Sequence, residues 1–155
     1  IPKIMTHPEY YNYLDERKKH YEKLSNIAYK ILKDVPCLMV NRTDGAFYMT
    51  IVFNESGLNS NQTLHIQNRE VREFVEKLVK EPIEHDKRFV YYLLASTGIC
   101  VVPLTSFFTP LLGFRMTLLD KDEAEFEQTV KTIGQKFTEY IDSSSKGIQT
   151  AINLS

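Results

Sequence analysis

The stretch from Phe89 to Leu119 limits the fold more than any other feature, because Arg115 is its only charged residue. The stretch is longer than the roughly 20 apolar residues that a helix needs to cross a bilayer. Two glycines and two prolines interrupt it, namely Gly98, Pro103, Pro110 and Gly113. Because these residues break helices and favour turns, the stretch predicts several short buried elements rather than one membrane helix.

The whole chain has the composition of an ordinary globular domain. It has 155 residues, of which 43% are hydrophobic and 25% charged, so it is long enough to enclose a core. The net charge of −1, with both signs interspersed, offers no basic face for nucleic acid and no polybasic membrane segment. No signal peptide is visible, so a cytoplasmic location is expected. The start at Ile1 instead of a methionine suggests processing, proteolysis or a cloned fragment.

Hydrophobic periodicity predicts an α+β domain. A long helix is expected over residues 7–34, because apolar side chains recur there at three- and four-residue steps. Further helices are expected over residues 68–80, 86–96 and 120–143, with Asn68 and Asp120 as N-caps. Short strands are expected over residues 37–40, 46–53, 99–102 and 114–118. These elements predict a small two-layer domain, with a short mixed or antiparallel sheet packed against helices.

The order of these elements gives three segments. Residues 1–35 form the long N-terminal helix, residues 36–143 the compact domain, and residues 144–155 a weakly structured tail. Cys100 lies in the apolar stretch and is expected to be a buried small residue. Together with Cys37 it is too little for a disulfide framework.

Arg115 is open to two interpretations. Its guanidinium can reach solvent at a strand end or pair with one of the many carboxylates of the chain. It can also receive the carboxylate or phosphate of a ligand through two parallel hydrogen bonds. Composition does not decide between them.

Other catalytic chemistry is sparse in this sequence. The four histidines, His7, His20, His65 and His85, have no spacing that would converge on a metal, and no metal site is expected. There is also no glycine-rich phosphate loop and no Gly-x-Ser-x-Gly nucleophile motif.

Three segments of the chain stand out as motifs, namely Gly45-Ala46-Phe47-Tyr48, the run TGICVVP at residues 97–103 and the run FRMTLL at residues 114–119. Together they resemble the C-terminal small domain of fold-type I, pyridoxal-phosphate-dependent aminotransferases. The nearest likeness within that family is to the alanine aminotransferase branch. The likeness runs in order from Asp15 to Ile141 and is most specific over residues 97–119. It implies that the long first helix is the one that links the large and small domains of these enzymes.

The resemblance also implies roles for two residues. In this family the arginine of the FRMT strand grips the α-carboxylate of the amino-acid substrate, and the matching residue here is Arg115. Gly45 is expected to shape the backbone near the same substrate site. A planar, bidentate guanidinium fixes the rotation of a carboxylate better than a lysine ammonium can, which suits stereospecific chemistry at the neighbouring carbon.

This sequence departs from the family in one loop and lacks the cofactor residues. The family usually reads Pro-Gly-x-x-Phe-Gly after the strand, whereas residues 103–108 read Pro-Leu-Thr-Ser-Phe-Phe. The lysine, carboxylate and phosphate-binding residues of the family lie upstream of everything in this chain. The Ser-Ser-Ser-Lys-Gly run at residues 143–147 imitates the cofactor-lysine motif, but it follows the last helix, so Lys146 is expected to be a solvated residue.

The implied function is that of a fragment. The full-length enzyme would use pyridoxal phosphate (PLP) to move an amino group between an amino acid and a 2-oxo acid. The fragment alone is expected to bind no cofactor and to be inactive. Its expected partners are the missing large domain and a second copy, since family members are homodimers. The alternatives are a non-catalytic α+β binding or regulatory module, and a PLP-dependent lyase or synthase of the same fold.

Overall fold

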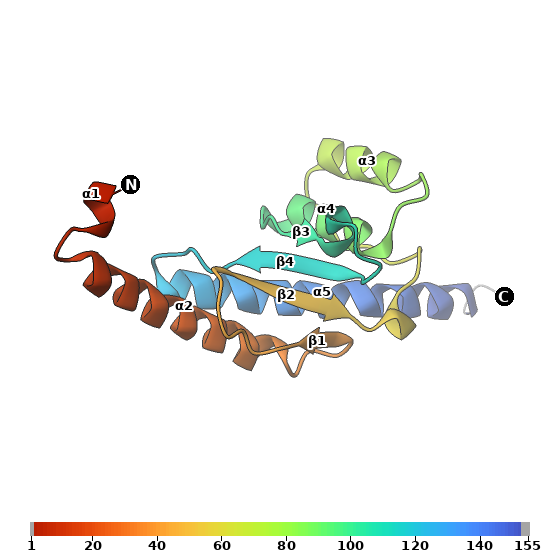
Figure 1. The fold of residues 1–155 in the computed structure, drawn as a ribbon. Coiled ribbons are helices and arrows are strands. Elements are labelled where there is room, and N and C mark those ends of the chain that lie inside the picture. The colour runs from red at the N-terminus through yellow and green to blue at the C-terminus, as the bar shows by residue number, and fades with distance from the viewer. Residues whose placement is uncertain (1, 153–155) are drawn as a thin grey trace.

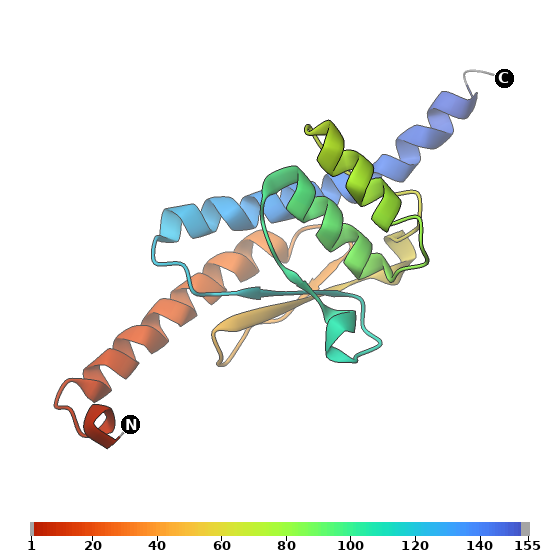
Figure 2. The same ribbon diagram turned by 90° about the horizontal axis from the view of Figure 1, so that it is seen from above.

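A computed structural model describes the backbone of residues 2–152 and the side chains of residues 2–144. The fold is α+β, with helices on one face of a small antiparallel sheet (Figures 1 and 2). The helices are α1 (Pro2–Met5), α2 (Tyr10–Leu32), α3 (Arg69–Leu78), α4 (His85–Thr97) and α5 (Glu123–Ile152), with short 3-10 helices η1 (Glu55–Gly57) and η2 (Leu104–Phe107). The strands are β1 (Leu38–Val40), β2 (Tyr48–Phe53), β3 (Val102–Pro103) and β4 (Gly113–Thr117).

The sheet is fully antiparallel, with strand order β1-β2-β4-β3. Strands β2 and β4 form its centre, and Thr50 of β2 lies opposite Arg115 of β4. Side chains alternate between the two faces of a strand, so Ile51 and Phe114 point into the core while Thr50 and Arg115 point the other way. The sheet therefore has one covered face and one open face.

Aromatic rings fill the space between the covered face and the helices. Phe53 of β2 packs against Phe89 of α4 and Phe137 of α5, and Phe114 of β4 also reaches Phe89. Phe89 in turn contacts Tyr140 of α5. All five side chains are buried, so this cluster ties the two central strands to two helices.

The long helix α2 is buried over only part of its length. Its buried residues Leu24, Ser25, Ala28 and Leu32 all lie in the C-terminal half, which packs along α5. The N-terminal half extends away from the rest of the domain (Figure 2), and Tyr11 and Tyr13 on it are exposed. The predicted long helix is thus present, but it begins only at Tyr10, after the separate short helix α1, and its first half packs against little among the described residues.

Local signals predicted most helix ends correctly. The Asn68 side chain accepts a hydrogen bond from the Val71 amide at the start of α3, and Gly98 ends α4 in the left-handed conformation with φ of 78°. The N-cap expected at Asp120 was wrong, since it is Asp122 whose Oδ1 accepts from the Ala124 and Glu125 amides.

Two predictions about the ends of elements were also wrong. The strand expected over residues 99–102 is reduced to Val102–Pro103, and Cys100 is exposed. The reason is that β3 lies at the sheet edge and buries only one side, so Val101 is buried and its neighbours are not. Helix α5 continues to Ile152, so residues 144–152 are helical instead of weakly structured, while residues 153–155 lie outside the described residues.

Candidate carboxylate-binding site

Arg115 lies at the middle of β4 and points to the open face of the sheet. It pairs with Thr50 on one side and Val102 on the other, and its neighbours Phe114 and Met116 point into the core. Its place in the strand alternation therefore sends the guanidinium away from the packed interior. The one charged residue of the apolar stretch thus lies on the sheet face that the helices do not cover.

Two aromatic rings hold the guanidinium of Arg115. Its Cζ lies over the ring of Tyr48 at 4.4 Å from the ring centre and over the ring of Phe107 at 4.0 Å. Tyr48 belongs to β2, and Phe107 to η2, which follows β3 on the opposite side of β4. Rings at these distances attract a cation through the negative charge of their faces, although they do not neutralise it.

Arg115 has no anionic partner among the side chains of residues 2–144. None of the ion pairs between these residues includes it, and its Nε is buried without a hydrogen-bond partner. An unpaired buried donor on a charged group costs free energy. The described side chains therefore offer no ion-pair partner for Arg115.

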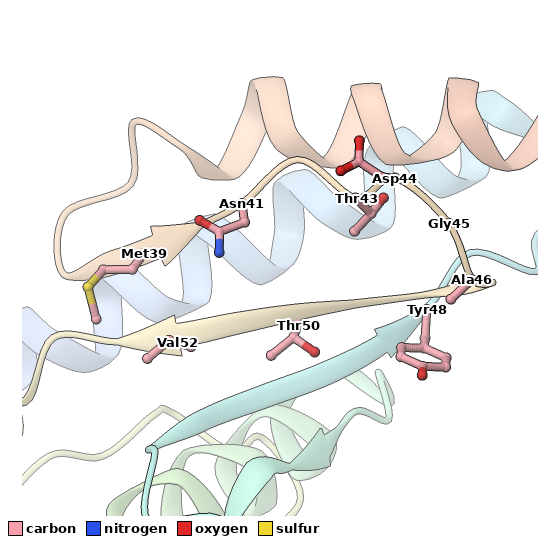
Figure 3. Close-up of a pocket in the computed structure, with 9 residues that line it drawn as sticks. All are labelled: Met39, Asn41, Thr43, Asp44, Gly45, Ala46, Tyr48, Thr50 and Val52. Carbon is pink, nitrogen blue, oxygen red and sulfur yellow. The ribbon is translucent and has the colours of Figure 1, made fainter.

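A groove runs along the open face of the sheet (Figure 3). Its volume is about 450 Å³, within the range of small-molecule sites. Tyr48, Thr50 and Val52 of β2 form one side, and the loop after β1 forms the other with Asn41 and Asp44. Arg115 is not a lining residue, but it stacks on Tyr48 and lies opposite Thr50, so the groove and the cation share a border.

Gly45 lies at the edge of this groove. An added Cβ at Gly45 would meet no atom of the chain within 4 Å, and its φ is not in the left-handed region. Its neighbour Ala46 has the positive φ, of 68°. Among the described residues, no contact requires glycine at position 45. The unusual backbone conformation that was expected at Gly45 occurs at Ala46 instead.

The loop that departs from the family pattern has kept a glycine-type turn. Phe108 stands where the family has its second glycine and adopts φ of 57°, a conformation that costs a non-glycine residue about 1–2 kcal/mol. Its side chain is fully exposed. The first departure, Leu104, is buried in the domain. At the first glycine position Leu104 packs into the domain, and at the second Phe108 adopts the strained left-handed conformation.

The described side chains include no site for a metal or for a cofactor lysine. Residues 2–144 contain no group of three or more metal-ligating side chains, and the four histidines are not brought together. A lysine that forms an imine is usually desolvated, whereas the lysines in this range are exposed or, like Lys87 and Lys136, paired with glutamates. The side chain of Lys146 lies outside the described residues.

Sequence reasoning missed the residues that support Arg115. Strand register and loop conformation bring Tyr48 and Phe107 to Arg115, and no local sequence pattern predicts them. The one available signal was the alternation of β2, which places Tyr48 and Thr50 on the same face as each other.

Comparisons with known proteins relate the chain to part of a longer protein. No family model matches the chain. Over 141 residues, which are 91% of the chain, it is 50% identical to an uncharacterized aminotransferase of the archaeon Methanocaldococcus jannaschii. The matched part is 32% of that relative. No helix in the described part of the chain is both long and apolar enough to span a membrane. The chain is thus related, over nearly all of its own length, to about one third of an aminotransferase.

Proposed function

We propose that this chain is the C-terminal part of a PLP-dependent aminotransferase of the alanine aminotransferase branch, and that Arg115 receives the α-carboxylate of its substrates. The observation that carries the proposal is the guanidinium of Arg115, which lies on the open face, stacks between two rings and has no anionic partner among the described side chains. The size of the relative supports the first half of the proposal, since it is about three times as long as the matched region.

The role of Arg115 follows from the chemistry of a planar cation. Two parallel N–H groups donate to the two carboxylate oxygens of an amino acid or a 2-oxo acid, which fixes the plane of the carboxylate. The bond that must break at the neighbouring carbon is then held in one direction, and this positioning lowers the barrier. The apolar rings of Tyr48 and Phe107 strengthen the ion pair by keeping water away from the guanidinium.

The remaining chemistry belongs to residues outside this chain. PLP, when bound to the upstream domain, supplies an electron sink that lets the amino group move between carbon skeletons. This chain contributes substrate binding and orientation, and by itself it is expected to be inactive. The proposal includes a homodimer in the cytoplasm, with the large domain against the open face and the exposed half of α2.

The decisive experiment uses the longer protein from the upstream reading frame. It should contain a lysine after a strand, and with PLP it should transfer the amino group of L-alanine to 2-oxoglutarate or to another 2-oxo acid, detected as the new amino acid. Release of ammonia or β-elimination without transfer would favour a lyase of the same fold. A frame that stops just before Ile1, with no such lysine, would favour a non-catalytic module.

A further inference from the structure

The ring of Phe107 is held by a very short element. Helix η2 spans only Leu104–Phe107, and the hydrogen-bond geometry of such 3-10 turns is poorer than that of an α-helix. Phe107 itself is 42% exposed, so its own packing gives limited support. Buried Leu104 anchors the start of the turn, so further support for its Phe107 end must come from the residues between them.

Asp86 supplies that support from the first turn of α4. Its carboxyl group is 0% exposed. Oδ2 accepts a hydrogen bond from the Thr105 amide at 2.9 Å, and Oδ1 accepts from the Thr105 hydroxyl at 2.9 Å and from the Lys87 amide at 2.8 Å. Two of the three bonds therefore leave the helix and end on one residue of η2.

These bonds differ from those of a helix cap or an ion pair. The N-cap residue of α4 is Glu84, and the only helical amide that Asp86 binds is that of the adjacent residue. None of the ion pairs among the described residues includes Asp86, and the amine of the neighbouring Lys87 binds Glu84. The buried carboxyl group is thus mainly committed to Thr105, two residues before the ring on Arg115.

We propose that Asp86 is a positioning residue for Arg115, acting through Thr105 and Phe107 to fix the plane of the guanidinium. Because the Arg115 Nε lacks a hydrogen-bond partner in the described structure, the two stacked rings must set this plane. Tyr48 is held by strand β2, whereas Phe107 ends a turn that is held by the buried Leu104 and by the Asp86–Thr105 contact. A catalytic role for this positioning of Arg115 rests on the proposed function, in which Arg115 binds a carboxylate.

The substitution Asp86→Asn isolates the effect. Both carboxyl oxygens accept from a backbone amide, so the NH₂ group of asparagine must face one of these donors whichever way it is turned. Thr105→Val removes only the hydroxyl bond and leaves the amide bond, while Thr105→Ser keeps both. Glu84→Gln makes the same carboxylate-to-amide change two residues away, at an exposed side chain.

The test follows the Nε–H signal of Arg115 by nuclear magnetic resonance in the ¹⁵N-labelled chain, assigned by its loss in Arg115→Lys. We expect rotation about the Nε–Cζ bond to be about two- to fivefold faster in Asp86→Asn and Thr105→Val, as the loss of one cation–ring contact allows. Thr105→Ser and Glu84→Gln should match the unmodified chain. An unchanged rotation rate in folded Asp86→Asn, or in Thr105→Val if Asp86→Asn does not fold, would overturn the proposal.

Titration with sodium acetate separates this inference from the proposed function. If acetate shifts the Arg115 signal, and about two- to fivefold more is needed in Asp86→Asn and Thr105→Val, both ideas are supported. If rotation responds to the substitutions while acetate has no effect on any chain, the positioning role stands and the carboxylate role of Arg115 fails.

Discussion

Gly113 lies so close to Ile51 across the β2–β4 pair that a Cβ on it would overlap the Ile51 carbonyl oxygen. The atoms around this position are backbone as well as side chain, since the Val52 Cα would be 3.0 Å away. Gly113 also has φ of 153°, which side chains rarely adopt. Gly113→Ala should therefore push the two central strands apart and destabilise the domain by about 2–4 kcal/mol, measured by urea unfolding. A loss below about 0.5 kcal/mol would show that the strands yield easily.

Gly45 provides the matched comparison. A Cβ there meets nothing within 4 Å, so Gly45→Ala should change the unfolding free energy by no more than about 0.5 kcal/mol. In the longer protein the same substitution should raise KM for the amino acid, because we propose that the space above Gly45 is used by substrate or by the large domain. Unchanged kinetics would remove Gly45 from the site without affecting the role of Arg115.

Arg115 itself should matter for substrate binding and little for folding. In the longer protein, Arg115→Ala should lower kcat/KM, with a loss of transition-state stabilisation of about 2–4 kcal/mol, because a charge-assisted bidentate contact to the substrate is lost. Arg115→Lys should restore only part of this, since a lysine cannot fix the carboxylate plane. Arg69→Ala, which removes an exposed arginine of α3 paired with Glu73, serves as the control and should be neutral. Near-normal kinetics of Arg115→Ala would reduce this residue to a structural role.

Phe108 should be a source of strain that glycine relieves. Its φ of 57° costs about 1–2 kcal/mol, while replacement by glycine adds about 0.4–1 kcal/mol of unfolded-state entropy. Because the side chain is fully exposed, no burial is lost, and Phe108→Gly should stabilise the chain by about 0.5–1 kcal/mol in urea unfolding. Leu111→Gly is the control on the same loop, and it should destabilise because Leu111 has no positive φ. A destabilised Phe108→Gly chain would mean that the ring makes contacts in solution.

The sequence predicted the elements of this fold better than it predicted their ends. Local signals such as Asn68 and Gly98 act within a few residues, and both proved correct. The edge strand was overestimated because the apolar run from Ile99 to Val102 gives no sign that only one side is covered. The end of α5 was placed too early because the serines of residues 143–145 are weak helix formers, yet the helix continues through them.

The site was predictable only at its centre. Arg115 stood out as the lone charge in an apolar stretch, and the structure places it on the open face without a partner among the described side chains. Its substrate role remains a prediction. The residues around it come from three separate parts of the chain, and Asp86 and Thr105 are 19 positions apart in sequence. Their convergence depends on how α4, η2 and β4 pack, which no local pattern contains.

The last prediction concerns Tyr140 and alkaline stability. Burial raises the pKa of the Tyr140 hydroxyl well above its ordinary value, although the nearby Arg88 charge opposes this, and the oxygen has no hydrogen-bond partner in the described structure. In the unfolded chain a tyrosine ionises near pH 10, whereas the folded chain keeps its proton, so folding stability is fully present below about pH 10 and falls as the pH rises further. Removing the hydroxyl in Tyr140→Phe should therefore leave stability at pH 7 unchanged or higher by up to about 1 kcal/mol. The advantage should grow between about pH 10 and 11, by up to about 1.4 kcal/mol per pH unit. Urea unfolding from pH 7 to 11 measures both the stability difference at pH 7 and its growth at high pH. Tyr11→Phe, at an exposed tyrosine, is the control at pH 7. A Tyr140→Phe chain that is less stable at pH 7, with no relative gain at high pH, would show that the hydroxyl is bonded in solution.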